Sequence, residues 1–367
     1  MNFARLHPGR GGLLLGLLLM LAACASQRPV VSPAQRDRIH GELLARLPAT
    51  LSDRADWARD IERAFTALGI SPSVPHLCAV LAVTAQESGY KADPRVPNLA
   101  RIARAEIDRR AARYHIPRFA VSAALALRST DGQSYAERLQ RVQTEGQLSL
   151  LFEDLIGRVP LGRRLFGDAN PVRTGGPMQV SIAFAERWAD QHHYPYANPD
   201  TVRREVFTRR GGLYYGIAHL LGYPVSYDRM LYRFADFNAG FYASRNAAFQ
   251  QAVNRLGNTH LDLDGDLLSY DDTLSETEQA LRQLGSKLDL RDAEIHAALQ
   301  QSETHEFEKT ALYHRVYALA ESRSGSTLPR AMLPKIRLES PKISRQLTTA
   351  WFAERVDRRY RRCLGSR

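Results

Sequence analysis

The chain has 367 residues, of which 44% are hydrophobic and 24% are charged. This composition allows buried cores for about two domains and excludes wholesale disorder. Basic residues exceed acidic ones by 50 to 39, a net charge of +11. Three cysteines, at positions 24, 78 and 363, are too few for a disulfide scaffold or a cysteine-based zinc module.

The N-terminus has the pattern of a secretory signal. Arg5 and Arg10 precede an apolar run over residues 11–23, and no acidic residue occurs there. The run is shorter than the about 20 apolar residues that a membrane-spanning helix needs. We therefore predict a signal peptide over residues 1–23.

The apolar run ends in Leu-Ala-Ala followed by Cys24, which resembles the lipobox of bacterial lipoproteins. The resemblance implies cleavage before Cys24 and acylation of that residue, which would anchor the mature protein in a membrane. The alternative is an uncleaved tail that ends in cysteine by chance. Ala25 and Ser26 follow, and the absence of Asp there favours the outer membrane in lipoprotein sorting. We predict a lipidated tether over residues 24–37 and a location on the periplasmic face of the outer membrane.

Without the signal peptide the chain carries a net charge of +9, because that segment contains two arginines and no acid. In a periplasmic protein this excess favours an anionic polymer such as peptidoglycan over nucleic acid. The arginines are scattered over helical faces, however, so that a solvated surface explains them equally well.

From about residue 38 onward the apolar spacing is helical. Residues 54–68 show it best, with one apolar stripe composed of Trp57, Ile61, Phe65 and Leu68. Alternating strand patterns and fixed repeats are absent from the sequence. We predict a mostly α-helical fold.

The helix predicted after Ser73 is almost free of charge. Ser73 can cap it, Pro75 suits its first turn and Gly89 suits its end. Its buried stripe comprises Leu77, Val80, Leu81 and Thr84. Glu87 is the single acid, and both burial and the helix dipole would raise its pKa, as a general acid requires. The alternative is that Glu87 only marks where the helix meets solvent.

Four further segments follow in chain order. They are Gly-Gly-Pro-Met-Gln at 175–179, a helix with Gly212 and Gly216 one turn apart, Phe-Asn-Ala-Gly at 237–240, and Thr-Ala-Leu-Tyr at 310–313. Together with Glu87-Ser88 they resemble the motifs of soluble lytic transglycosylases, peptidoglycan-cleaving enzymes with a lysozyme-like helical fold. The chain is also similar to an uncharacterised family of bacterial lipoproteins.

The resemblance implies a reaction without cofactor or metal. Glu87 would protonate the glycosidic oxygen between N-acetylmuramic acid and N-acetylglucosamine. It would then take the proton of the muramoyl C6 hydroxyl, so that an anhydro product closes. Ser88 would hydrogen-bond near the scissile bond. Ordinary glycosidases need two carboxyl groups, whereas this pattern needs one.

The resemblance also implies the substrate-binding residues. Gly176, Met178 and Gln179 would line the sugar groove, Asn238 would position the sugar beside the acid, and Tyr313 would orient Glu87. Simpler roles compete with these: Met178 can fill the core, Asn238 can form a turn and Tyr313 can pack on its helix.

Two departures limit the resemblance and leave alternatives open. A helical insertion over residues 91–173 separates Glu87-Ser88 from the Gly-Gly-Pro-Met-Gln segment. We predict that it lies within a catalytic domain over residues 38–325. If it occludes the groove, the protein binds peptidoglycan without cleaving it. If Asp168 faces the groove, it could activate water, as in goose-type lysozymes. Pro177 and Phe237 replace a small aliphatic residue and a tyrosine of the family pattern.

The C-terminal extension, residues 326–367, contains an apolar stripe that predicts a docking helix: Trp351, Phe352, Val356 and Tyr360. Near its end lies Cys363. In the oxidising periplasm Cys363 could pair with Cys78. A buried free thiol at position 78 is an equally good interpretation.

Overall fold

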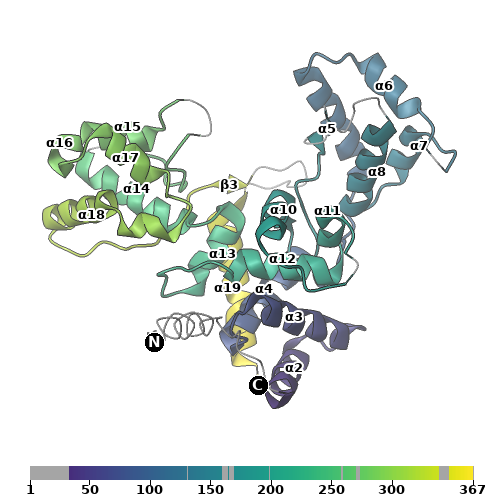
Figure 1. Cartoon of the computed structure of the whole chain (residues 1–367), viewed down its shortest axis with the longest axis horizontal. Coiled ribbons are helices and arrows are strands. Elements are labelled where there is room, and N and C mark those ends of the chain that lie inside the picture. Colours follow the sequence, from purple (N-terminus) through teal and green to yellow (C-terminus); the bar gives the residue numbers. More distant parts are fainter. Residues whose placement is uncertain are drawn as a thin grey trace, which may run out of the picture.

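The computed structural model describes residues 33–366 apart from positions 130, 159–163, 165–168, 198, 258, 270–272 and 339–346. The predicted signal peptide, Cys24 and Asp168 lie outside the described residues. The described chain is mostly helical, as predicted from the apolar spacing (Figure 1). No helix among these residues is long and apolar enough to cross a membrane.

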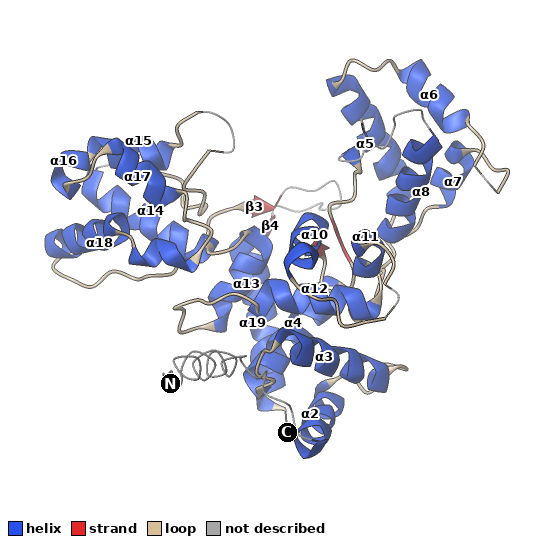
Figure 2. Ribbon diagram, in the orientation of Figure 1, coloured by secondary structure: helices blue, strands red, loops and turns tan. Residues whose placement is uncertain are grey.

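Strands within the described ranges are limited to two short antiparallel pairs (Figure 2). β1 (Thr174–Gly175) pairs with β2 (Val180–Ser181), and β3 (Arg337–Leu338) pairs with β4 (Leu347–Thr348). The first pair forms the hairpin that carries the Gly-Gly-Pro-Met-Gln segment.

The central body is built from helices at both ends and in the middle of the chain. Its members are α2 (Pro33–Arg46), α3 (Arg54–Leu68), α4 (Val74–Glu87), α10 (Ile182–Gln191), α11 (Val202–Val206), α12 (Arg209–Leu221), α13 (Met230–Ala239) and α19 (Thr349–Gly365). The stripe predicted for residues 54–68 is confirmed: α3 has those bounds, and Trp57, Ile61 and Phe65 are buried.

α4 is a largely buried helix of this body. Ser73 accepts a hydrogen bond from the backbone N–H of His76 (3.3 Å), and Pro75 lies in the first turn, as predicted. Every residue from Leu77 to Thr84 is buried, which explains why this stretch carries no charge. The helix ends at Glu87, and Gly89 and Tyr90 follow with φ of 59° and 63°. Their left-handed backbone turns the chain sharply away from the helix.

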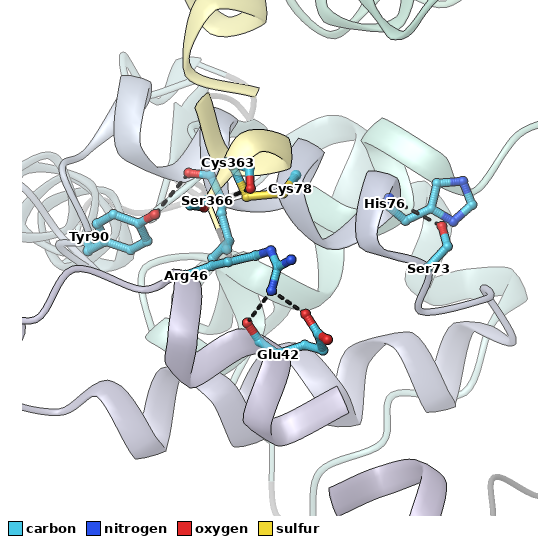
Figure 3. The surroundings of a disulfide bond; sticks show 9 residues. Glu42, Arg46, Ser73, His76, Cys78, Tyr90, Cys363 and Ser366 are labelled. Carbon is cyan, nitrogen blue, oxygen red and sulfur yellow. Dashed lines mark hydrogen bonds and ion pairs between the residues drawn. A yellow bond between two sulfur atoms is a disulfide. The ribbon is translucent and has the colours of Figure 1, made fainter. Parts of the chain in front are cut away.

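The predicted docking of the C-terminal helix is confirmed. α19 packs against α4 and α13 and buries Phe352 and Val356. A disulfide joins Cys363, in its last turn, to Cys78 near the start of α4, with 5.5 Å between the two Cα atoms (Figure 3). The two helices therefore run antiparallel, and the crosslink settles the alternative that the sequence left open.

A second group of helices forms a lobe beside the central body (Figure 1). It comprises α5 (Leu99–Arg113), α6 (Arg118–Ala126), α7 (Tyr135–Arg141) and α8 (Glu145–Arg158). These residues fall within the segment that the sequence predicts as a helical insertion. Asp93 ties the base of the lobe together, because its carboxylate accepts hydrogen bonds from Thr144 Oγ1 (2.5 Å) and the N–H of Gly146 (3.1 Å).

The remaining helices enclose a separate hydrophobic core on the other side of the central body. They are α14 (Ala243–Gly257), α15 (Glu276–Gln283), α16 (Gly285–Leu288), α17 (Asp292–Leu299), the 3₁₀ helix η3 (His305–Lys309) and α18 (Ala311–Ser324). Phe249, Phe307 and Tyr317 are buried at its centre. The sequence prediction of one domain over residues 38–325 does not distinguish this core from the first.

Candidate functional site

The predicted catalytic end of α4 is partly accessible. Glu87 is half-buried, whereas Ser88 is only 9% exposed. The Ser88 hydroxyl donates to the carbonyl of Thr84 (3.2 Å) and accepts from the backbone N–H of Lys91 (3.2 Å). The structure thus uses Ser88 to close the end of the helix, and the predicted contact with substrate has no geometric support.

The Gly-Gly-Pro-Met-Gln hairpin is seated on α12. A Cβ atom at Gly212 would overlap Pro177, and one at Gly216 would overlap the side chain of Met178. The absence of a Cβ atom at these two glycines therefore allows the hairpin to pack closely on α12. A Cβ atom at Gly176, where φ is 76°, would likewise overlap the backbone carbonyl of Val206.

This packing corrects two predicted roles. Met178 is 0% exposed and fills the core against α12 instead of lining a groove. Gly176 is buried as well, so that neither residue is placed to touch a sugar. Both shape the loop from beneath, and the simpler interpretation of Met178 holds.

Gln179 is the partly exposed residue of the Gly-Gly-Pro-Met-Gln segment. Its side chain folds back on the hairpin, where its Oε1 accepts a hydrogen bond from Thr174 Oγ1 (3.4 Å). Gln179 is half-buried and has a left-handed backbone with φ of 52°, a conformation that costs a non-glycine residue about 1 kcal/mol or more. Its backbone N–H and its side-chain Nε2 both donate to the carbonyl of Gly176 (3.1 and 3.2 Å). Such strain is most often kept where function requires it.

Asn238 is exposed in the last turn of α13. Its Oδ1 accepts a hydrogen bond from Thr349 Oγ1 (3.0 Å) at the start of α19. Further along α19, Arg355 Nε donates to Gln86 Oε1 (3.0 Å) at the end of α4. Thr349 and Arg355 are six residues apart, a rise of about 9 Å along the helix. At about 100° per residue the two side chains leave α19 in different directions, so that α19 contacts the end of α13 and the end of α4 on different sides.

Tyr313 is not part of this arrangement. It lies on α18, 6% exposed, with its ring 5.8 Å from that of Phe249 and 5.5 Å from that of Phe307. Burial raises the pKa of its phenol to about 12. Figure 1 shows α18 and α4 in different parts of the molecule. The predicted role of Tyr313 in orienting Glu87 is thus corrected: the phenol belongs to the second core.

Tyr313 instead borders a cavity of about 710 Å³ between the second core and the central body. Tyr227 and Tyr232 of the central body line one side, and Glu308 and Arg330 line the other. Ser226 Oγ donates to Glu308 Oε2 (2.7 Å) across this boundary. The cavity is distinct from the end of α4.

The sequence analysis did not assign a role to Asp236, which is 0% exposed in α13. Its carboxylate accepts hydrogen bonds from Tyr227 Oη (2.8 Å) and the N–H of Ser244 (2.7 Å). Burial raises its pKa to about 6 despite these donors. The sequence contains one signal for this residue: a charged side chain within the apolar helical stretch Phe-Ala-Asp-Phe.

Arg245 lies close by, in the first turn of α14, the helix that begins the second core. It is 1% exposed, and its guanidinium carbon lies 4.2 Å from the ring centre of Tyr242 and 5.1 Å from that of Phe307. Its Nη1 donates to the carbonyl of Thr304 (2.8 Å) and Nη2 donates to that of Ser302. Arg245 is thus a fully satisfied structural cation.

The described residues contain no cluster of three or more His, Cys, Asp or Glu side chains placed to hold a metal ion. The central body carries a half-buried carboxyl at Glu87, a strained amide at Gln179 and an exposed amide at Asn238. These groups can donate a proton and hydrogen-bond a polar ligand.

Comparison with known proteins gives one family and one relative. A model of the family described as "Protein of unknown function (DUF1615)" matches residues 50–366. The chain is 52% identical over 366 residues to "Uncharacterized protein YaiW" of Escherichia coli (strain K12), and the match covers 98% of this chain and 99% of that protein. No solved structure gives a significant match.

Proposed function

Since the chain belongs to the DUF1615 family, whose description names no activity, we propose its function from the site itself: a peptidoglycan lytic transglycosylase with Glu87 as its single general acid and base. One observation carries the proposal. Of the motif residues on the central body, Glu87, Gln179 and Asn238 are at least partly accessible, while Gly176, Met178 and Ser88 are buried. A lysozyme-like arrangement of this body, with residues 91–173 inserted into it, is part of the proposal.

In the proposed reaction the Glu87 carboxyl protonates the oxygen between N-acetylmuramic acid and N-acetylglucosamine. The resulting carboxylate then accepts the proton of the muramoyl C6 hydroxyl, whose oxygen closes the anhydro ring. Because the nucleophile belongs to the substrate, one protein carboxyl serves both steps, in contrast to the pair in ordinary glycosidases.

The two amides supply hydrogen bonds to the sugar. Asn238 Oδ1 is held by Thr349, so its Nδ2 donor is directed by that contact and left for a ligand. Gln179 Nε2 carries a second hydrogen beyond the one donated to Gly176. Tyr313 and Met178 have no part in this mechanism.

The lipid anchor at Cys24 and the outer-membrane location stay predictions of the sequence. They fit the proposal, because an enzyme anchored there by acyl chains faces the peptidoglycan layer.

The test is digestion of purified sacculi with the chain from residue 25 onward, which retains every described residue. Mass spectrometry of the soluble products should show anhydro-muropeptides. Glu87→Gln should lower their yield by a factor of about 100 or more, since it removes the general acid. Glu62→Gln is the matched control, because Glu62 is a partly buried carboxyl on neighbouring α3 and should leave the yield unchanged.

Equal yields from the wild type and Glu87→Gln would exclude the mechanism. Products with ordinary reducing ends would favour the hydrolase alternative, in which Asp168 activates water.

A second function, peptidoglycan binding without cleavage, is favoured by one observation: Tyr313 lies in the other core. It predicts that the chain sediments with sacculi and releases no products, whichever residue occupies position 87.

A further inference from the structure

Four arginines share one face of α19. Arg355, Arg358, Arg359 and Arg362 follow one another at the spacing that places side chains on the same side of a helix. With Arg361 they line a hollow of about 470 Å³. We call these four residues the arginine face.

None of the four arginines of the arginine face is held by an ion pair within the described part of the chain, although Glu354 and Asp357 lie on the same helix. Arg361 forms an ion pair with Asp357 (2.7 Å). Burial and the like charges of Arg355 and Arg362 lower the pKa of Arg359. A bound anion would relieve this mutual repulsion.

The guanidinium groups are held in place before any ligand arrives. Gln86 Oε1 accepts hydrogen bonds from Arg355 Nε (3.0 Å) and Arg359 Nε (3.2 Å). Both contacts leave the terminal Nη1 and Nη2 atoms available for a ligand. The disulfide at Cys363, next to Arg362, fixes the last turn of the helix on α4 (Figure 3).

The ligand chemistry that fits this face is phosphate. Arginine presents a planar fork of N–H donors that matches phosphate oxygens in two parallel hydrogen bonds. The arginine face spans seven residue steps, a rise of about 10 Å, which suits several neighbouring phosphates better than one isolated anion.

Two features place these phosphates on a membrane surface. Leu364 is 39% exposed in the turn that follows the arginines, and an apolar side chain beside basic ones is typical of helices that lie in a lipid interface. The end of α19 also lies near the C-terminal half of α2, a helix that begins at Pro33, within the predicted lipidated tether (Figure 3). An acyl anchor combined with a basic patch holds a protein on a bilayer better than either alone.

We propose that the arginine face of α19 binds the phosphate groups of anionic phospholipids and docks the body of the protein onto the membrane surface. This inference does not depend on the proposed cleavage of peptidoglycan.

The test measures cosedimentation of the chain from residue 25 with vesicles. Vesicles of phosphatidylglycerol and phosphatidylcholine should bind the protein, with an affinity that falls as salt is added, and vesicles of phosphatidylcholine alone should not. The double variant Arg358→Gln/Arg362→Gln keeps both contacts with Gln86. Removing two charges should weaken binding about thirty-fold.

The matched control is Arg59→Gln/Arg291→Gln. It removes the same two charges from exposed arginines that are paired with Asp56 and Glu294, and it should bind like the wild type. Arg358→Lys/Arg362→Lys keeps the charge and should retain most of the binding, which separates loss of charge from loss of fold.

Equal binding by the Arg358→Gln/Arg362→Gln variant and the wild type would overturn the proposal. Binding of inorganic pyrophosphate without binding of phosphatidylglycerol vesicles would overturn it too, because the site would then serve a soluble phosphate. If the control variant lost as much binding, the overall charge of the protein and not the arginine face would explain the effect, which would also overturn the proposal.

Discussion

The two hydrophobic cores of the molecule differ in how clearly their residues indicate a function. In the central body, glycines at 212 and 216 admit a hairpin, and a capped apolar helix ends at Glu87. In the second core, the aromatic rings of Phe249, Phe307 and Tyr313 pack on one another. The segment around Tyr313 resembles the same enzyme family, yet it folds into the core that does not contain Glu87. Motif order along a chain therefore does not determine which core a motif joins.

The junction between the cores gives the largest expected effect. Arg245→Ala should lower the free energy of unfolding by about 3–5 kcal/mol, because it removes the buried ion pair with Glu308 and the guanidinium donors to the carbonyls of Ser302 and Thr304, and it opens a void beside Phe307. Denaturant unfolding would measure this. Arg315→Ala, which removes a partly exposed pair with Asp289, should cost less than about 1 kcal/mol. Similar losses from the two variants would mean that the buried contacts of Arg245 contribute no more than a surface ion pair.

The disulfide belongs to the central body alone and gives the next effect. Cys78→Ser/Cys363→Ser should cost about 2–4 kcal/mol, since the crosslink spans 285 residues of sequence and restricts the unfolded chain. Thermal unfolding under oxidising conditions would show the loss. Reducing agent should destabilise the wild type and leave the variant unchanged; equal sensitivity of both would indicate that the two cysteines are not paired.

Asp236 should make stability depend on pH. Burial raises its folded pKa to about 6, against 3.8 in the unfolded chain. Between about pH 4 and 6 the unfolded carboxyl loses its proton while the folded one keeps it, so stability falls as the pH rises, by at most about 3 kcal/mol. The difference in unfolding free energy between the wild type and Asp236→Asn, measured at both ends of this range, isolates the group. A difference that stays constant with pH would show that Asp236 titrates normally.

Local features of the central body follow from the sequence, whereas long-range placement does not. The bounds of α3 follow from one apolar stripe, and the start of α4 follows from Ser73 and Pro75. The burial of Met178 depends on how the hairpin sits on α12, and the pairing of Cys78 depends on the course of the chain over 285 residues. These are tertiary facts, which helical periodicity and capping preferences do not contain.

The smallest expected effect tests the comparison between the cores most directly. Tyr313→Phe removes only a hydroxyl from the second core. The free energy of unfolding should therefore change by less than about 1 kcal/mol, and the yield of anhydro-muropeptides should change by less than about twofold. The resemblance to lytic transglycosylases instead implies that this hydroxyl orients Glu87. If Tyr313→Phe lowered the yield as far as Glu87→Gln does while stability held, α18 would have to approach α4 during the reaction, and the two cores would act as halves of one site.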